Sequence, residues 1–176
     1  MIWESAYWKD DLLKRAEFLR QKQRQRRWTE RSLAKVEQTV MIGFYSIRKL
    51  ADANKVSGDV MARQVRVRQF LAVGKPVTLL NWHHIDELYD LRKGQAVYLS
   101  LKDLCNQFIH SYCFIVSFNG QGCFNGVLVC SDHSRRRRLY YVSARAIIGI
   151  LRNVGRHYPA RMTMTYNKNK QDYDVS

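Results

Sequence analysis

Proline and acidic residues are scarce in this chain of 176 residues. Only two prolines occur, which excludes a long proline-rich linker between domains. The apolar runs fall well short of the ~18 residues that a membrane-spanning helix needs, and the N-terminus lacks the regions of a secretion signal. We therefore expect a cytoplasmic protein without a membrane span, whose four cysteines are reduced thiols.

Common catalytic and cofactor-binding motifs are also missing. The sequence has no Walker A phosphate loop, no G-x-S-x-G nucleophile motif and no H-E-x-x-H zinc motif. The glycines of "NGQGCFNG" stand at hairpin positions rather than before a helix, so they do not predict a nucleotide loop. No cofactor is predicted.

Positive charge, in contrast, is abundant. The chain has 30 basic and 15 acidic residues, a formal net charge of +15, and both halves of the chain share the excess. Such a charge favours anionic partners, nucleic acid first and then an anionic membrane surface or an acidic protein. Apolar residues make up 46% of the chain, which is too many for a disordered protein.

The periodicity predicts a single α+β domain over residues 1–176. Residues 1–56 are predicted to form an N-terminal helical hairpin. Residues 64–166 are predicted to form an antiparallel α+β core, so that the hairpin packs with an antiparallel sheet of about five to six strands and a C-terminal helix. Residues 167–176 are predicted to be a loose tail.

Helical spacing and strand-like alternation divide this domain into elements. We expect helices over 5–27, 29–53, 82–91 and 101–110, with a last helix that Ser143 caps and Gly155 ends. We expect strands over 65–73, 77–80, 112–118, 123–130, 139–142 and 160–166, the second pairing with the first and the fourth with the third.

A polar face on the helix over 101–110 is the first candidate site. At 100° per residue, Asp103, Asn106 and His110 lie within about 60° of one another. A carboxylate, an amide and an imidazole together suit proton transfer or the orientation of a water molecule. An ordinary solvated helix face is the alternative.

A zinc site is the second candidate. If residues 119–122 are the hairpin turn, Cys113 lies opposite Leu128, and His110 comes close to Cys130. His133 lies three residues beyond Cys130, so His110, Cys113, Cys130 and His133 are predicted near one end of the hairpin, and two histidines with two cysteines suit tetrahedral zinc. The alternative, which we favour, is that the cysteines are small buried apolar residues and bind no metal.

Basic residues in three segments are candidates for phosphate contacts. They are Arg20, Lys22, Arg24, Arg26, Arg27 and Arg31 near the first helix, Arg66 and Arg68 on the first strand, and Arg135, Arg136, Arg137 and Arg138 in a loop. Tyr140 and Tyr141 adjoin the last group and are able to stack on unpaired bases. The alternatives are that residues 135–138 form a solubilising loop and that the two tyrosines fill the core.

The hexapeptide "RNVGRH" contains Arg152, Asn153 and His157. It resembles the R-N-x-x-x-H spacing of HEPN-type ribonucleases, in which arginine and histidine of two protomers act on RNA. The resemblance covers six residues. HEPN domains are all-helical, whereas strands are predicted here before this helix.

These observations predict a non-enzymatic accessory protein that binds nucleic acid or another polyanion through an arginine-rich and lysine-rich surface. The first alternative is a metal-independent ribonuclease or other hydrolase that uses His110, or Arg152 with His157. The second is a subunit that binds a larger protein through its first two helices, with Trp3, Tyr7 and Trp8 as anchors.

Overall fold

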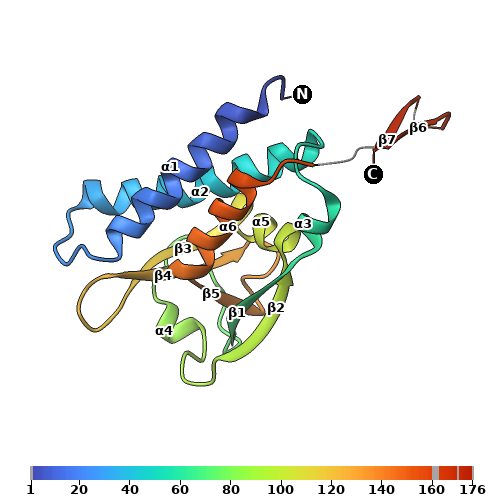
Figure 1. Cartoon of the computed structure of the whole chain (residues 1–176). Coiled ribbons are helices and arrows are strands. Elements are labelled where there is room, and N and C mark those ends of the chain that lie inside the picture. The colour runs from blue at the N-terminus through green and yellow to red at the C-terminus, as the bar shows by residue number, and fades with distance from the viewer. Residues whose placement is uncertain (1, 160–162, 170, 176) are drawn as a thin grey trace.

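The computed structural model describes residues 2–159, 163–169 and 171–175. Its elements follow in the order α1 (Ser5–Lys22), α2 (Glu30–Asp52), α3 (Gly58–Ala62), β1 (Gln64–Leu71), α4 (Ile85–Leu88), β2 (Gln95–Ser100), α5 (Leu101–Ile109), β3 (Ser111–Phe118), β4 (Phe124–Ser131), β5 (Arg138–Ser143), α6 (Ala144–Arg156), β6 (Met164–Asn167) and β7 (Asp172–Val175). The predicted α+β fold, with N-terminal helices, an antiparallel sheet and a C-terminal helix, is confirmed (Figure 1).

The five-stranded sheet has the order β2-β1-β5-β4-β3, and each neighbouring pair is antiparallel. Helices α1, α2, α5 and α6 lie on one side of this sheet (Figure 1). The main core fills the space between these two layers, where the Phe44 and Phe108 rings stack with centroids 4.0 Å apart. Burial of such apolar faces is the main favourable term in folding.

The first helix ends earlier than its sequence predicts. We expected it to continue to Arg27, but α1 ends at Lys22, where the buried stripe of Leu12, Ala16 and Leu19 has run out. Trp28 then holds the connecting loop, because its Nε1 donates a hydrogen bond of 2.8 Å to the Gly122 carbonyl. The loop between α1 and α2 therefore rests on the turn of the β3–β4 hairpin.

The segment after β1 differs most from its prediction. Residues 77–80 form an irregular segment that enters a turn rather than a strand, and only Ile85–Leu88 of the predicted helix over 82–91 is helical. The Asn81 carboxamide oxygen accepts hydrogen bonds from the Thr78 amide and hydroxyl, which closes a turn in place of capping a helix. The partners of β1 are instead β2 and β5.

The β3–β4 register also differs from its prediction. Cys113 lies opposite Cys130 rather than Leu128, because Phe118 pairs with Phe124 instead of Cys123 and the register shifts again between Phe118 and Ser117. The connection between the strands is one residue longer than expected, residues 119–123, and Gly122 within it has a φ of 75°, a backbone conformation that favours glycine. A β-bulge adds a residue on one strand only, so counting from the turn no longer gives the partner.

At the C-terminus, α6 continues past Gly155 to Arg156. Gly155 packs inside the molecule, where a Cβ atom would lie 2.8 Å from Leu13 Cδ2. The predicted last strand is β6, which pairs with β7 in a separate two-stranded sheet. Residues 172–175 are therefore a strand rather than a loose tail, while 160–162, the start of the predicted strand, lie outside the described residues. In the described part of the chain, no helix has the length and apolar character to cross a bilayer.

Candidate nucleic-acid interface

The segment over 72–91, which includes α4, packs on the sheet face opposite α1, α2, α5 and α6. Phe70, Val77, Leu88, Tyr89 and Leu139 form a second apolar cluster there. The cluster closes one end of this sheet face and leaves the other end open.

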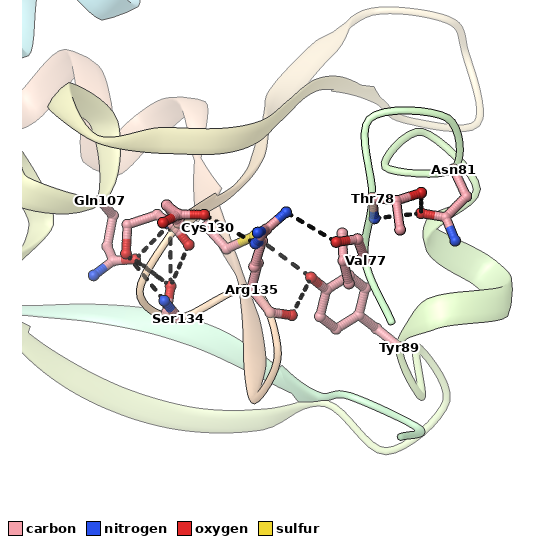
Figure 2. A network of polar contacts seen from close by, with 10 residues as sticks. Val77, Thr78, Asn81, Tyr89, Gln107, Cys130, Ser134 and Arg135 are labelled. Carbon is pink, nitrogen blue, oxygen red and sulfur yellow. Dashed lines mark hydrogen bonds and ion pairs between the residues drawn. The ribbon is translucent and has the colours of Figure 1, made fainter. Parts of the chain in front are cut away.

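Arg135 fastens this segment to the sheet (Figure 2). Its Nη1 donates a hydrogen bond of 2.9 Å to the Val77 carbonyl, and its own carbonyl accepts one of 2.7 Å from the Tyr89 hydroxyl. The guanidinium carbon lies 3.7 Å from the centre of the Tyr112 ring, and Nε pairs with Asp132 at 2.9 Å. Arg135 is therefore an internal structural residue.

The same loop is held from its other side by α5. Ser134 donates a hydrogen bond of 2.7 Å from its hydroxyl to Gln107 Oε1, and the Ser131 amide donates to the same oxygen at 3.0 Å. Figure 2 shows Gln107 with Ser134 at one end of these contacts, Arg135 with Val77 and Tyr89 in the middle, and Thr78 with Asn81 at the other end. The network therefore ties α5, the loop after β4 and the segment over 72–91 together.

A shallow groove of about 650 Å³ remains at the open end of the face. It is lined by Arg66, Arg68, Phe70, Leu91, Ala96, Ser117, Asn125, Leu128, Tyr141 and Ser143 together with Val67. None of these described lining residues is acidic. Both arginines are exposed, and neither guanidinium makes an ion pair or hydrogen bond within the described ranges. The groove therefore presents two guanidiniums to an anionic ligand.

Tyrosines flank these arginines on both sides. Arg68 pairs with Tyr141 across β1 and β5, and Arg66 pairs with Tyr98 across β1 and β2. The Tyr98 side chain is 64% exposed. Tyr141 is half-buried, and its hydroxyl donates a hydrogen bond of 2.9 Å to the Asn125 carbonyl. Burial raises the pKa of Tyr141, against an opposing effect of the Arg68 charge, so this hydroxyl stays protonated.

A second basic hollow, of about 380 Å³, lies between α1 and α6. Arg20, Arg145 and Arg152 line it with Gln23, Ile148 and Gly149. Glu17 contacts two of these arginines, Arg20 at 2.6 Å and Arg152 at 3.6 Å. The hydrogen bond from Arg20 lowers the pKa of Glu17 to about 2, so the carboxylate is ionised at neutral pH.

Some of the predicted phosphate-contact residues are exposed, and others have partners within the protein. Arg24, Arg26 and Arg27 are exposed in the α1–α2 loop, Lys22 donates to Gln25 Oε1, and Arg31 is exposed on α2. Within 135–138 the side chains differ: Arg136 is exposed and unpartnered in the described chain, Arg137 lies 2.9 Å from His133 Nε2, and Arg138 donates to Gln69 Oε1. Four adjacent arginines therefore do not form one surface.

Sequence reasoning missed two residues of these surfaces. Tyr98 was not expected beside Arg66, because the pairing of β1 with β2 was not predicted. Arg145 was not singled out, although Arg145, Gly149 and Arg152 recur at helical spacing and so share one face of α6. Of the tyrosines that were predicted, Tyr141 faces the groove, whereas Tyr140 is buried in the core.

The three polar residues of α5 have separate partners. Asp103 accepts a hydrogen bond from the Ser100 hydroxyl and belongs to the helix cap. Asn106 Oδ1 accepts from Arg48 at 2.8 Å, which ties α5 to α2. His110 is exposed at the C-terminal cap. These contacts give Asp103 and Asn106 structural roles, and no contact joins the three side chains.

The residues of the proposed zinc site do not form a cluster. Cys113 and Cys130 are buried opposite each other, whereas His133 contacts Arg137. Among the described residues no group of three histidine, cysteine or acidic side chains has the arrangement for a metal ion.

The hexapeptide "RNVGRH" is divided between two sets of contacts. Arg152 pairs with Glu17 on α1, whereas His157 Nε2 accepts a hydrogen bond of 3.3 Å from the Ser57 amide before α3. A histidine that accepts at Nε2 is neutral, and burial, aided by the charges of Lys9 and Arg63, lowers the pKa of His157. His157 therefore joins the end of α6 to the α2–α3 connection.

This contact predicts a pH-dependent stability. Because the folded state lowers the pKa of His157 below its ordinary 6.5, the unfolded chain binds more protons as the pH falls, and folding loses stability below about pH 6.5. Urea unfolding at pH 7.5 and pH 5.5 should show a loss of about 1 kcal/mol, the size of one hydrogen bond. His157→Gln should have a smaller pH dependence, and an equal dependence in both proteins would contradict this role.

Comparison with known proteins adds no functional information. No protein-family model, no curated protein and no solved structure matches the chain. A functional hypothesis therefore depends on the geometry of these surfaces.

Proposed function

We infer that this protein binds single-stranded nucleic acid in the groove on the open sheet face. The observation that carries this proposal is the pair Arg66 and Arg68, which are exposed, have no acidic neighbour in the groove lining and alternate with tyrosines on adjacent strands. Guanidiniums bind phosphate oxygens in a forked geometry. Aromatic rings on a sheet face stack on unpaired bases, and each stacked base contributes about 1–3 kcal/mol.

The shape of the groove favours a single strand over a duplex. Tyr98 and Tyr141 lie on the sheet surface itself, and a base must leave its stack before a ring can lie against it. The groove is shallow, and the described elements that border it include no long helix that projects from the surface, which is the element that most often enters a major groove.

The test is oligonucleotide binding as a function of salt. Wild-type protein should bind fluorescent single-stranded oligonucleotides at low salt with an affinity that falls steeply as salt rises. Arg66→Gln/Arg68→Gln should weaken binding at least about tenfold and reduce the slope of log K against log salt by about 1.4, since each phosphate contact on a single strand contributes about 0.7.

The control is Lys35→Gln/Lys102→Gln, which removes the same charge from two exposed lysines on helices α2 and α5. Circular dichroism should show that both double variants are folded. The proposal fails if the two double variants lose affinity equally, or if wild-type protein binds no oligonucleotide at low salt.

A protein partner is the second candidate. Trp3 and Tyr7 are 97% and 77% exposed, and a hollow lined by Ile2, Trp8 and Tyr45 lies beside them. Aromatic side chains in such positions are typical anchors of protein interfaces. This surface belongs to α1 and α2 and is separate from the groove.

A further inference from the structure

The groove and the α1–α6 hollow meet at the start of α6. Ser143 lines the groove, and Arg145 lines the hollow. Two residues span at most about 7 Å of chain, so the groove on the free sheet face and the hollow on the helix side both reach the junction of β5 and α6. Only Ala144, which is fully buried, lies between them in sequence.

The positive charge continues across this junction. Ser143 caps α6 by accepting a hydrogen bond from the Ala146 amide, and the N-terminal end of a helix carries a partial positive charge. Arg145 and Arg152 lie seven residues apart, which places them on one side of α6 and about 10 Å apart along its axis. Gly149 lies between them, and a Cβ atom there would meet no heavy atom within 4 Å, so the surface between the two arginines is open.

The hollow has an excess of positive charge even with its acidic residue counted. Three guanidiniums, of Arg20, Arg145 and Arg152, line it, and one ionised carboxylate, of Glu17, contacts it. Arg145 has no ion pair in the described chain. Arg145 is therefore available to bind a phosphate. Arg20 and Arg152 are able to bind the phosphate as well, although both also contact the Glu17 carboxylate.

We propose that one single strand of nucleic acid occupies both hollows, running from Arg66 and Arg68 around the start of α6 to Arg145, Arg152 and Arg20. This path, called the track below, rests on the proposed function of the groove. It extends the binding site from the groove alone to a longer surface that accommodates a polymer. The ligand class is a single-stranded polynucleotide long enough to leave the groove and reach α6. Short oligonucleotides occupy the groove alone.

The experiment compares two lengths of oligothymidylate, four and twenty nucleotides, by fluorescence anisotropy with the full chain. Arg145→Gln/Arg152→Gln should weaken the binding of the 20-mer about tenfold and reduce its salt slope by about 1.4. It should leave the affinity for the 4-mer unchanged within about twofold. Each variant is compared with wild type at the same length, so the larger number of registers on the longer strand does not enter the comparison.

Two further variants make the result specific. Arg145→Lys/Arg152→Lys keeps the charge and should keep the salt slope of the 20-mer. Lys35→Gln/Lys102→Gln removes the same charge elsewhere, and it should change the affinities for the 4-mer and the 20-mer by the same factor. Unfolding in urea checks that each protein is folded, which we expect because Arg145, Lys35 and Lys102 are exposed and Arg152 is only partly buried.

The outcomes separate the track from the groove. If Arg145→Gln/Arg152→Gln binds both lengths as wild type does while Arg66→Gln/Arg68→Gln is weakened, the track is wrong and the groove proposal stands. If the α6 variant loses the 4-mer and the 20-mer equally, the track is also overturned, because the hollow would then act on strands too short to connect it with the groove. If Arg66→Gln/Arg68→Gln binds as the lysine control does, the proposed function itself fails.

Discussion

Arg135→Met is expected to lower the free energy of unfolding by about 3 kcal/mol. The substitution removes a charge-assisted hydrogen bond to the Val77 carbonyl, which is worth about 1.5–3 kcal/mol, and the contact of the guanidinium with the Tyr112 ring, which adds about 1–2 kcal/mol. Methionine retains some of the packing of the Arg135 side chain, and the exposed Asp132 is solvated after the change. In a chain of this length the unfolding midpoint should fall by about 6–12 °C.

Arg136→Met is the matched control. Arg136 is the next residue, is exposed and has no partner within the described ranges, so its replacement should change stability by less than about 0.5 kcal/mol. Thermal and urea unfolding followed by circular dichroism measure both variants. Hydrogen exchange should show loss of protection over 72–91 in Arg135→Met, because that segment loses its attachment to the sheet. Equal unfolding midpoints for the two variants would refute the structural role of Arg135.

Gly126→Ala should have a comparable effect in the opposite part of the same sheet face. A Cβ atom at Gly126 would lie 2.4 Å from the Val142 carbonyl oxygen and 2.8 Å from the Tyr141 ring. The neighbouring strand backbone must move to admit it, and forced expansion of a packed structure costs about 1–3 kcal/mol. Because Tyr141 is displaced, oligonucleotide affinity should also fall under conditions where the variant is folded.

Gly149→Ala is the same substitution at a position without steric conflict. No heavy atom lies within 4 Å of its added Cβ, and alanine is favoured over glycine within a helix by about 1 kcal/mol. Urea unfolding should therefore show Gly126→Ala destabilised and Gly149→Ala unchanged or stabilised. If both variants are equally stable, the close strand approach at Gly126 does not determine stability.

Several elements could be predicted from sequence because their signals are local. The stripe of α2 and the caps of Thr29, Ser100 and Ser143 are read from neighbouring residues, and all three caps are present. The alternation of Val65 and Val67 with Arg66 and Arg68 also placed the two arginines together on one face. Local spacing is sufficient where an element's own residues determine its shape.

Three of the failures concern residues whose neighbours are distant in the chain. Residues 77–80 did not become the partner of β1, because β2 and β5 took that position. The register of Cys113 depended on bulges that the turn residues do not reveal. The hexapeptide around Arg152 has its contacts divided between α1 and the α2–α3 connection. Its resemblance to a known motif covers six residues, and so short a match carries no information about the surrounding fold.

The sequence by itself determined the α+β class, the positions of the main helices and strands, and the excess of positive charge, since these follow from periodicity and composition. Only the tertiary structure decided which charges are available to a ligand. Arg135 and Arg136 are adjacent and chemically identical, yet one is held by Val77, Tyr112 and Asp132 while the other is exposed. The availability of a guanidinium depends on what packs against it, and those groups come from other parts of the chain.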